Sequence, residues 1–454
     1  MKLVFVIGAG PAGLYASNKL AQAGHQVVLL NRDIKPGGLA EYGIYPVKEK
    51  MKGGLRKQFG RILSQPNLHY LGHLPVASNQ AVTLNSLREF SPAAIVCAVG
   101  AQGTKKLGLG GEDSKGVYSA KDFVYHYNLL PPFSSRDFST GKRVAIVGMG
   151  NVMVDIARWL LIDDPGRKTE EVIVVARRGP FEAKFDHKEF EHIEMFLDRK
   201  GFEDELQRVK DPLKAVGQDV SQVAAEKTFF VLTRTDDIPQ GPRLRFRFLC
   251  SPKVIHGDST GRIERLTLTE NVLVERNGGT SAKATDRTHE LDVDTMIFAI
   301  GDVVDPGFGL PNTHGAYVTN PDQADPKRAA YEVYDPEAKR VLEGTYVVGW
   351  ARKASEGLVG VARFDAEQGA AHILQFLESA PEKRSATIHD IRSQFGRSGL
   401  ETVSEDDLEF LARAEQRQAS ERGLPSFKFA DDAKMLGAIE AEKTKSTASN
   451  LVSR

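Results

Sequence analysis

Two stretches of this sequence share one pattern of apolar, glycine and helical positions. Leu3 to Ile7 form a continuous apolar run, which leads into the turn Gly8-Ala-Gly10-Pro11-Ala-Gly13 and a helical pattern that ends near Gly24. Val144 to Val147 lead in the same way into Gly148-Met-Gly150-Asn-Val-Met153 and the helical stretch Val154 to Leu161. An unbroken apolar run of this length is typical of a parallel strand that is buried on both faces. The pattern predicts two units of strand, tight turn and helix.

Each unit continues with matching elements. A second strand is expected at Gln26 to Leu30 in the first unit and at Glu171 to Ala176 in the second. Each unit then closes with an apolar strand that ends in glycine, at Ala94 to Gly100 and at Thr295 to Gly301. Two copies at so large a spacing favour two nested βαβ units of the Rossmann kind over a solenoid.

Both turns have the composition of a loop that binds a pyrophosphate. Glycine lets the backbone turn tightly and approach the phosphates, and the following helix presents free N–H groups and a partial positive charge. Met153 takes the position of the third small residue in the second turn, so the second helix is expected to stand slightly away from its strand. The alternative for either turn is a strand-to-helix connection that binds nothing.

The residues after the second strand of each unit indicate which dinucleotide is bound. Arg177 and Arg178 follow the second unit's strand, where NAD sites usually carry an acidic residue for the ribose hydroxyls. Two guanidinium groups can instead hold a 2′-phosphate, which favours NADPH over NADH; two solvated arginines are the alternative. Asn31 stands at the same place in the first unit. It can accept a ribose hydroxyl, but without charge, so a weaker grip on FAD is expected.

The predicted fold class is α/β, with two Rossmann-like dinucleotide-binding domains and a helical C-terminal extension. At 454 residues the chain is too long for one core. We expect residues 1–103 and 303–377 to form the first, FAD-binding domain, with residues 104–302 inserted into it as the NADP-binding domain. Tyr346 to Trp350 is the predicted returning strand of the first domain. Residues 378–454 form the extension, with disorder expected from Thr444.

Composition narrows the possible partners and compartments. Lysine plus arginine and aspartate plus glutamate each number 60, so the broad basic excess of a nucleic-acid-binding protein is absent. The two cysteines, Cys97 and Cys250, form no CxxC pair, which excludes an internal iron–sulfur cluster and a redox dithiol. The apolar runs are of strand length, and the first strand begins at Lys2. We therefore expect a cytoplasmic protein with no membrane partner; nothing indicates its oligomeric state.

Several separated motifs resemble the adrenodoxin reductase family of NADPH–ferredoxin reductases. The resemblance runs from Lys2 to about Ala371. Its motifs are the Gly8 to Gly13 turn, Gly38-Leu39 with Tyr42-Gly43-Ile44 and Pro46, Gly116 to Ala120 with Tyr127-Asn128, Gly148 to Asp155, Arg177 to Pro180, Lys188-Glu189, Leu244 to Pro252, and Gly349-Trp350 followed by Gly357.

The resemblance implies a set of cofactor contacts. Those to FAD are implied at Ala12, Asn31, Gly38, Leu39, Leu74, Trp350, Gly357, Leu358 and Val359. Those to NADP are implied at Gly150, Asn151, Val152, Arg177, Arg178, Glu189 and Gly357. Trp350 is expected against the flavin; an ordinary core tryptophan is the alternative.

Two segments depart from the family pattern. Val47-Lys48 stand where the family usually has Asp-His after the proline of the flavin loop, so a salt bridge from Lys48 is what could replace a histidine contact with Asp155. Asp155 is accordingly the candidate for the catalytic neighbourhood. The family's threonine-rich stretch is Val361 to Asp365 here. Both changes fall where flavin and acceptor should meet, which leaves the identity of the acceptor least certain.

The resemblance implies hydride transfer from NADPH to FAD, then single-electron transfer to an acidic ferredoxin or flavodoxin-like protein. Hydride transfer needs positioning and no protein acid or base. A basic docking patch is expected on a chain that is neutral overall. The candidates are two clusters, Lys48, Lys50, Lys52, Arg56 and Lys57, and Arg243, Arg245 and Arg247 in a strand ending at Cys250; a solvated face is the alternative for each.

Other functions remain open at this stage. A flavin-dependent NADPH oxidase or monooxygenase would use the same cofactors, with oxygen or a small substrate as acceptor. The NADPH-handling subunit of an assembly such as a glutamate synthase is disfavoured, because the cysteine-rich cluster region is missing. A redox-sensing module that binds dinucleotides without turning them over is compatible with the glycine loops, and Asn31 and Met153 mildly favour it.

Overall fold

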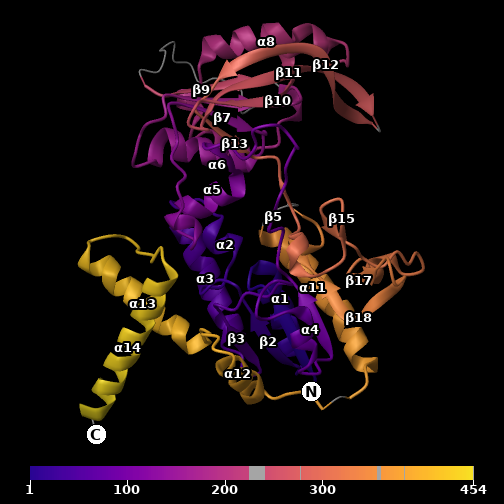
Figure 1. The fold of residues 1–454 in the computed structure, drawn as a ribbon, viewed down its shortest axis with the longest axis vertical. Helices are drawn as coiled ribbons and strands as arrows, with labels where there is room; N and C mark the ends of the chain where they lie inside the picture. Colours follow the sequence, from indigo (N-terminus) through magenta and orange to yellow (C-terminus); the bar gives the residue numbers. More distant parts are fainter. Residues whose placement is uncertain (224–240, 277, 355–358, 383, 453–454) are drawn as a thin grey trace. The chain divides into compact units, whose positions relative to one another are not determined.

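The computed structural model describes residues 1–223, 241–276, 278–354, 359–382 and 384–452 (Figure 1). The chain divides into two compact units. Unit 1 consists of Met1–Lys105, Tyr125–Ser135 and Gly301–Arg454, and unit 2 of Lys106–Val124 and Arg136–Ile300. Unit 2 is thus inserted in the sequence of unit 1, and within this insertion the segment Tyr125–Ser135 returns to unit 1.

Unit 1 is built on a six-stranded sheet with the strand order β17-β18-β4-β1-β2-β3. The strands β1, β2, β3 and β4 are mutually parallel, and β18 pairs parallel to β4. The chain therefore returns to this sheet as predicted, but the strand ends at Val347 and the predicted strand position Trp350 lies in a 3₁₀ turn. β17 pairs antiparallel to β18 at the edge. The strand bounds are β1 Leu3–Ile7, β2 Gln26–Leu30, β3 Leu68–Leu71, β4 Ala94–Cys97, β17 Glu332–Asp335 and β18 Arg340–Val347.

Both faces of this sheet are covered by helices, which is why β1 is apolar at every position. Val4 and Val6 point into a core formed with α1 Pro11–Gln22, α3 Glu49–Leu63 and α11 Val359–Ser379. The alternate residues of β1 point into a second core, to which α4 Leu84–Arg88 and α12 Ile388–Arg397 contribute. A strand with side chains on both sheet faces must be apolar throughout when both faces are buried.

Unit 2 repeats the plan on a five-stranded, all-parallel sheet with the order β6-β13-β7-β8-β9. One face of this sheet is covered by a three-stranded antiparallel sheet, β10-β11-β12, whose Leu266 and Leu268 lie in one core with Ala145 and Val147. The bounds are β6 Val117–Ser119, β7 Arg143–Val147, β8 Glu171–Val175, β9 Arg243–Arg247, β10 Cys250–Gly257, β11 Ile263–Arg276, β12 Gly279–Asp292 and β13 Thr295–Phe298.

The two sheets confirm the predicted α/β class, while some element ends differ from the expectation. β9 ends at Arg247, and Leu249, with φ 50°, turns the chain into β10, so the predicted strand ending at Cys250 is two strands. The helix after Gly150, α6 Asn151–Arg158, continues as one turn of π-helix, Trp159–Asp163. The remaining elements are α2 Leu39–Tyr42, α5 Ala120–Tyr127, α7 His187–Phe190, α8 Arg199–Lys214, α10 Pro326–Ala329, β5 Gly103–Thr104, β14 Asp302–Val303, β15 Asn312–Thr313 and β16 Ala316–Tyr317.

The C-terminal extension is helical and packs on unit 1. After α12 it forms α13 Glu405–Glu421 and α14 Asp432–Val452, so the expected disorder from Thr444 is wrong as far as Val452. Val403 exchanges two backbone hydrogen bonds with Gly72, of 2.8 and 3.0 Å. The extension packs against the turn that follows β2 through a small hydrophobic core. This core is formed by Ile34, Val403, Leu411, Met435 and Ile439.

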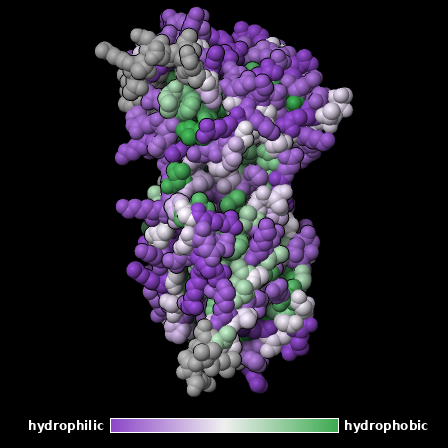
Figure 2. All heavy atoms as spheres, turned by 90° about the vertical axis from the view of Figure 1, so that its left-hand side faces the viewer, coloured by the Kyte–Doolittle hydropathy of each residue, from purple (hydrophilic) through white to green (hydrophobic). Residues whose placement is uncertain are grey.

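The surface is largely hydrophilic, which agrees with a composition that has equal numbers of basic and acidic residues. On the face that Figure 2 draws, hydrophilic residues predominate and hydrophobic residues appear in separate patches. None of the described helices is long and apolar enough to cross a membrane.

We predict that the extension contributes to the stability of unit 1 through its small core. Leu411 is 1% exposed in that core, whereas Leu424, in the same extension, is 47% exposed. Leu411→Ala should lower the free energy of unfolding by about 2–5 kcal/mol, because it removes buried methyl groups and leaves a cavity. Leu424→Ala, the control, should change it by less than about 0.5 kcal/mol. Urea unfolding with limited proteolysis of the extension measures both, and equal values for the two variants would contradict the packing described.

Candidate functional site

The first glycine loop leaves space where a pyrophosphate would lie. Gly8 has φ +100°, and a Cβ there would lie 2.6 Å from the carbonyl oxygen of Ala98. A Cβ at Gly13 would lie 1.8 Å from the carbonyl oxygen of Gly8, so the start of α1 needs glycine in order to pack against the loop. A Cβ at Gly10 would meet no atom within 4 Å. Gly10 thus fits a loop whose outer side faces a ligand and whose inner side is closed by backbone.

The second glycine loop, in unit 2, is built in the same way. Gly148 has φ +124°, and a Cβ there would lie 2.1 Å from the carbonyl oxygen of Ala299, the counterpart of Ala98. Its N–H donates to the carbonyl of Val175 at 3.0 Å, as that of Gly8 donates to Leu30 at 2.7 Å. Gly150 again has open space, and Met153 is completely buried. Both loops can therefore accept a pyrophosphate at a helix N-terminus.

The side chain of Asn31 holds the first glycine loop in place by hydrogen bonds. Its Oδ1 accepts from the N–H of Ala9 at 3.0 Å. Its Nδ2 donates to the carbonyls of Asp33 and Lys35, at 2.8 and 3.1 Å, and lies 3.1 Å from the hydroxyl of Tyr70. Because the side chain is 6% exposed, its polar atoms are largely committed to the protein. Holding the loop is therefore its structural role, and the contact with a ribose stays a prediction.

The other predicted FAD residues of this region gather around the same loop. The N–H of Gly37 donates to the carbonyl of Ala9 at 2.7 Å, and a Cβ at Gly38 would lie 3.1 Å from the Cα of Gly10. Leu39 begins α2 directly after this contact. The N–H of Leu74 donates to the carbonyl of Asn31 at 2.9 Å, and its side chain is buried. Gly38 thus lies against the glycine loop, Leu39 follows it in the chain, and Leu74 is anchored to the turn after β2.

A buried ionic cluster holds α2, and one of its members comes from the C-terminal extension. The carboxylate of Glu41, 3% exposed, pairs with Arg56 of α3 at 2.7 Å and with Lys428 at 2.7 Å. Burial alone would raise the pKa of Glu41, but the positive charges of Lys35, Lys428 and Arg56 outweigh it and hold that pKa well below its usual range. Sequence reasoning missed this cluster, because Lys428 stands in a segment of ordinary charged residues.

Burial also lowers the pKa of two lysines in this region. The pKa of Lys428 falls because its ammonium group lies inside the protein, 4.5 Å above the ring of Tyr42, even though Glu41 opposes the shift. Burial lowers the pKa of Lys52 to about 8, and its Nζ donates to Oδ1 of Asn128 at 2.8 Å. Lys52 and Arg56, both proposed from the sequence as members of a docking patch, therefore bind Asn128 and Glu41 of α2 within unit 1 instead.

The 3₁₀ turn after the returning strand brings Gly349, which precedes Trp350, to the start of α1. Gly349 has φ +64°, and a Cβ there would lie 2.4 Å from the Cβ of Ala12. Its N–H donates to Oδ2 of Asp365 at 2.7 Å, and Asp365, 8% exposed, also pairs with Arg352. Asp365 was missed because its role depends on α11 folding back onto this turn. Val359 is half-buried at the start of α11, and Gly357 and Leu358 lie outside the described residues.

The paired arginines of unit 2 lie one position further past their strand than Asn31 does in unit 1. Leu30 and Val175 accept from the equivalent glycines of the two loops, so Ala176 is the counterpart of Asn31, and Arg177 and Arg178 follow it. Arg177 is exposed and Arg178 partly exposed, just beyond the end of β8. Their backbone is fixed, because the carbonyl of Arg177 accepts from Nδ2 of Asn271 at 3.0 Å and that of Arg178 accepts from the N–H of Leu249 at 3.2 Å. Among the described residues, no hydrogen bond or ion pair engages either guanidinium group. Two uncompensated charges at this position suit a 2′-phosphate.

The remaining predicted NADP residues lie on α6 and α7. Oδ1 of Asn151 accepts from the N–H of Asp186 at 2.7 Å, which ties the second glycine loop to the start of α7. Val152 is 46% exposed, and Glu189 lies on α7. Asp155 follows Asn151 by four residues on α6, on the same side of the helix. Lys48 belongs to unit 1 and Asp155 to unit 2, and their salt bridge stays a prediction.

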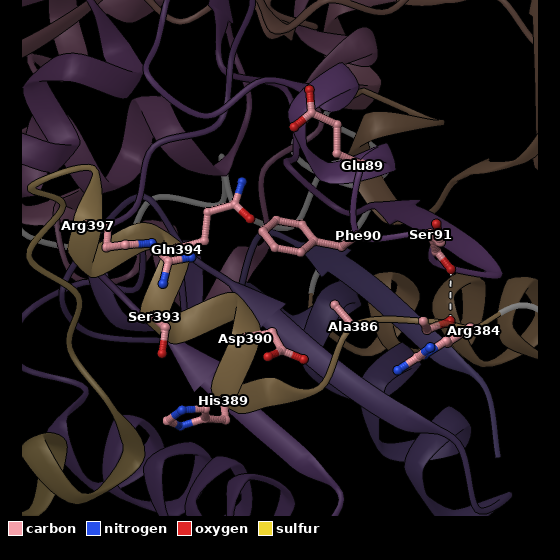
Figure 3. Close-up of a pocket in the computed structure, with 11 residues that line it drawn as sticks. Glu89, Phe90, Ser91, Arg384, Ala386, His389, Asp390, Ser393, Gln394 and Arg397 are labelled. Atoms are coloured by element: carbon pink, nitrogen blue, oxygen red, sulfur yellow. Dashed lines mark hydrogen bonds between the residues drawn. The ribbon is translucent and has the colours of Figure 1, made fainter.

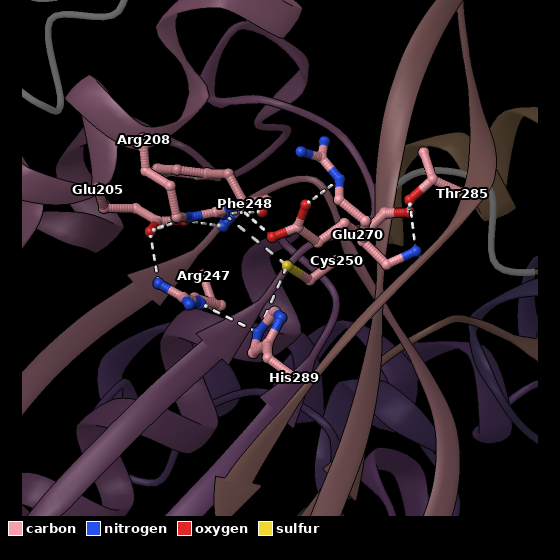
Figure 4. A network of polar contacts seen from close by, with 9 residues as sticks. Glu205, Arg208, Arg247, Phe248, Cys250, Glu270, Thr285 and His289 are labelled. Atoms are coloured by element: carbon pink, nitrogen blue, oxygen red, sulfur yellow. Dashed lines mark hydrogen bonds and ion pairs between the residues drawn. The ribbon is translucent and has the colours of Figure 1, made fainter.

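The motif Leu244 to Pro252 has a structural role in unit 2 (Figure 4). Glu205 of α8, 3% exposed, pairs with Arg208 at 2.6 Å and Arg247 at 3.0 Å and accepts from the N–H of Phe248 at 2.7 Å. Burial raises the pKa of Cys250 to about 11, so its thiol stays protonated. Arg245 pairs with Glu171 at 3.1 Å. The second predicted docking cluster is therefore largely neutralised by its own neighbours.

One surface hollow of unit 1 is lined by none of the residues of the first glycine loop. It has a volume of about 450 Å³ and is lined by residues near the end of α4 and on α12 (Figure 3). Phe90 of this hollow belongs to the core on the sheet face opposite α1. Its exposed charged residues are of both signs, with Arg384 and Arg397 beside Glu89 and Asp390. This arrangement does not resemble the glycine loops, and we assign no ligand to it.

Comparison with known proteins places these features in a family. The model of the pyridine nucleotide-disulphide oxidoreductase family matches residues 2–325. The NADPH-ferredoxin reductase FprA of Mycobacterium leprae is 30% identical over 83% of this chain and 84% of its own length. The mitochondrial NADPH:adrenodoxin oxidoreductase of Arabidopsis thaliana is 26% identical over 84% and 83%.

A solved structure extends the similarity to the fold. Mycobacterium tuberculosis FprA in complex with NADPH superimposes with a TM-score of 0.78 and 26% identity, over 96% of this chain and 99% of that one. Both the sequence and the fold are thus similar over most of the chain. The chain belongs to the pyridine nucleotide-disulphide oxidoreductases and, within them, to the adrenodoxin reductase-like NADPH–ferredoxin reductases.

Proposed function

We propose that this chain is an NADPH–ferredoxin reductase, which takes a hydride from NADPH onto FAD and delivers single electrons to a ferredoxin-type protein. The observation that carries the proposal is the pair of glycine loops on one plan, of which only the second is followed by two arginines without partners among the described residues. The two loops are followed by different residues, an asparagine in unit 1 and two arginines in unit 2, which suits the binding of two different dinucleotides. The names of the relatives, NADPH-ferredoxin reductase and NADPH:adrenodoxin oxidoreductase, agree.

FAD is assigned to the first loop. The open space at Gly10, the closed inner side at Gly8 and the adjoining Gly38-Leu39 segment fit a bound flavin dinucleotide. Trp350 reaches the same helix start through the contact of Gly349 with Ala12. We propose residues 1–103 and 303–377 as the FAD domain and residues 104–302 as the NADP domain. Gly357 and Leu358 stay in the proposed FAD site on the strength of the family resemblance alone.

The protein's own part in the reaction is binding and orientation. The bound flavin can accept a hydride and give up electrons one at a time, which joins a two-electron donor to a one-electron acceptor. Asn151, Val152 and Glu189 are proposed to hold the nucleotide, and Asp155 belongs to the catalytic neighbourhood as a positioning residue. No side chain has to move a proton for the hydride itself to pass. Catalysis therefore depends mainly on the two glycine loops and on the residues that hold them in place, because these bind and orient the two dinucleotides.

The names of the relatives and the state of the cysteines support a proposal for the acceptor and the compartment. A ferredoxin-type acceptor is favoured by the relatives' names, and a flavodoxin-like protein would meet the same electrostatic requirement. An NADPH oxidase or monooxygenase is the second candidate, since Val361 and Phe364, 51% and 66% exposed, replace the family's threonine-rich stretch. Both cysteines are free and buried, as suits a reducing compartment such as the cytoplasm.

We predict that Arg177 and Arg178 set the preference for NADPH over NADH. Each charge-assisted bond to a phosphate contributes about 1.5–3 kcal/mol, so Arg177→Gln/Arg178→Gln should weaken NADPH binding by about 100-fold or more. The affinity for NADH, which has no 2′-phosphate, should change little. Arg243→Gln/Arg276→Gln, two other exposed arginines of unit 2, is the matched control. Anaerobic titration of the flavin absorbance measures each affinity, and an equal loss for both nucleotides would count against the assignment.

We also predict that Lys428 helps to retain FAD. Its ion pair with Glu41 fixes α2, the helix that begins at Leu39 of the proposed FAD site. Lys428→Met leaves Arg56 as the ion-pair partner of that buried carboxylate, with Lys35 as the other positive charge that acts on it, and the loss of one charged hydrogen bond should cost about 1.5–3 kcal/mol of local stability. The flavin content after dialysis should fall, and the FAD dissociation constant should rise by about tenfold or more. Lys434→Met, an exposed lysine of the same extension, is the control. Flavin affinity that is identical in the two variants would refute this coupling.

A further inference from the structure

We propose that the outward face of α3 is the surface on which the acidic, ferredoxin-type acceptor docks. This inference rests on the proposed function and adds to it the location of the partner. Sequence reasoning left two basic clusters open, and the structure separates them by showing which charges are already paired. The experiment below distinguishes a wrong docking face from a wrong function.

The face is a continuous stripe along α3. At 100° per residue, positions 50, 51, 54, 57, 58 and 61 fall within about a third of the circumference of the helix. Five of these residues are exposed and Gln58 is partly exposed. We call this stripe the α3 face; its members are Lys50, Met51, Gly54, Lys57, Gln58 and Arg61.

The positive charges of the α3 face are uncompensated. Among the described residues, no ion pair or hydrogen bond engages the charged groups of Lys50, Lys57 or Arg61, and no acidic residue stands on the face itself. Arg56, on another side of α3, is by contrast paired with Glu41 and Glu49. Three unpaired cations within one stripe make a local positive field on a chain with zero net charge. Such a field steers an acidic partner and fixes its orientation.

The opposite side of α3 is tied to the flavin loop. Nε of Arg56 lies 2.7 Å from the carboxylate of Glu41, which belongs to the helix that begins at Leu39. The α3 face is therefore separated from that loop by about one helix diameter, roughly 10–12 Å. A protein seated on the face would lie beside the part of unit 1 assigned to the flavin.

Glycines within α3 are a second, independent observation. Gly53, Gly54 and Gly60 have no positive φ, and a Cβ on any of them would meet no atom within 4 Å. Glycine inside a helix costs about 1 kcal/mol relative to alanine, so three such residues weaken α3 with no steric need inside this chain. Gly54 lies in the middle of the α3 face. A bare backbone at this point lets a partner approach closely between the charges.

The end of α3 near the flavin loop adds apolar contact area. Val47 and Met51 are 57% and 56% exposed, at the start of the same stripe. Methionine is enriched in the core of protein interfaces, where charges are depleted, and basic residues around it suit a polar rim. A small apolar area flanked by Lys50, Lys57 and Arg61 has the composition of a short-lived electron-transfer interface.

The second basic cluster lacks this free charge. Arg245 pairs with Glu171 at 3.1 Å and Asp198 at 3.5 Å, and Arg247 pairs with Glu205 at 3.0 Å. Only Arg243 of that cluster has no ion pair among the described residues. Arg245 and Arg247 therefore stabilise unit 2, which leaves one free charge on β9 against three on the α3 face, and the acceptor is assigned to α3.

Charge reversal tests the proposal directly. We predict that Lys50→Glu/Lys57→Glu/Arg61→Glu will raise the KM for an acidic [2Fe–2S] ferredoxin about tenfold or more and remove most of its dependence on ionic strength, because steering is lost. The matched control is Lys253→Glu/Lys283→Glu/Lys327→Glu, which alters net charge equally at exposed lysines elsewhere. The control should keep the wild-type KM and salt dependence. NADPH-driven reduction of menadione, a small uncharged acceptor, reports in parallel on flavin and NADPH chemistry.

A glycine variant separates docking from stability. Gly54→Gln should stabilise the helix, by up to about 1 kcal/mol, because glutamine has the higher helix propensity. The same variant should raise the KM for ferredoxin severalfold, because a side chain now fills the point of close approach. A variant that is more stable but reduces ferredoxin with the wild-type KM would overturn this part of the argument.

The outcomes distinguish the two levels of the inference. If wild-type protein reduces ferredoxin and the α3 variant does so with unchanged KM, or if the control is impaired equally, the docking face is wrong and the proposed function stands. If the wild type reduces menadione with NADPH but transfers nothing to ferredoxin, the proposed function fails and the docking face fails with it. A raised KM confined to the α3 variants supports both.

Discussion

At the end of β1 the backbone passes so close to Ala98 that a methyl group on Gly8 would lie 2.6 Å from the carbonyl oxygen. The same approach recurs at the end of β7, where a methyl group on Gly148 would lie 2.1 Å from the oxygen of Ala299. In both units this steric limit places the closing strand, the glycine turn and the helix N-terminus together. The helix dipole and the free N–H groups then face open space at Gly10 and Gly150, which is where a pyrophosphate can bind.

The two sites differ in what surrounds this common geometry. In unit 1 Asn31, after β2, holds the glycine loop through the N–H of Ala9, and the neighbouring α2 is fixed by the ion pair of Glu41 with Lys428 of the C-terminal extension. In unit 2 the equivalent turn exposes the charges of Arg177 and Arg178. A closed, internally bonded site suits a cofactor that stays bound, and an open, charged one suits a nucleotide that exchanges at each turnover. These surroundings support the proposed assignment of FAD to unit 1 and NADPH to unit 2.

Much of the fold could be predicted from local pattern. The apolar runs of β1 and β7, and the glycines after them, follow from burial on both sheet faces and from backbone clearance, which act within a few residues. The roles of Glu41, Lys428 and Asp365 could not be found in this way, because their partners lie far away in the sequence: Glu41 and Lys428 are joined only after the extension has folded back onto α2. For the same reason, the sequence alone suggested that Arg245 and Arg247 were free charges. In the fold, Arg245 pairs with Glu171 and Arg247 with Glu205.

The central claim is that electrons pass from NADPH through FAD to a ferredoxin-type protein. The most direct test is an anaerobic spectral titration of the purified protein, with NADPH and separately with NADH, followed by addition of an oxidised ferredoxin. The account predicts that the flavin absorbance bleaches at far lower NADPH than NADH concentration and then recovers as the ferredoxin is reduced. A protein without flavin, or one that bleaches but leaves ferredoxin oxidised, would contradict it.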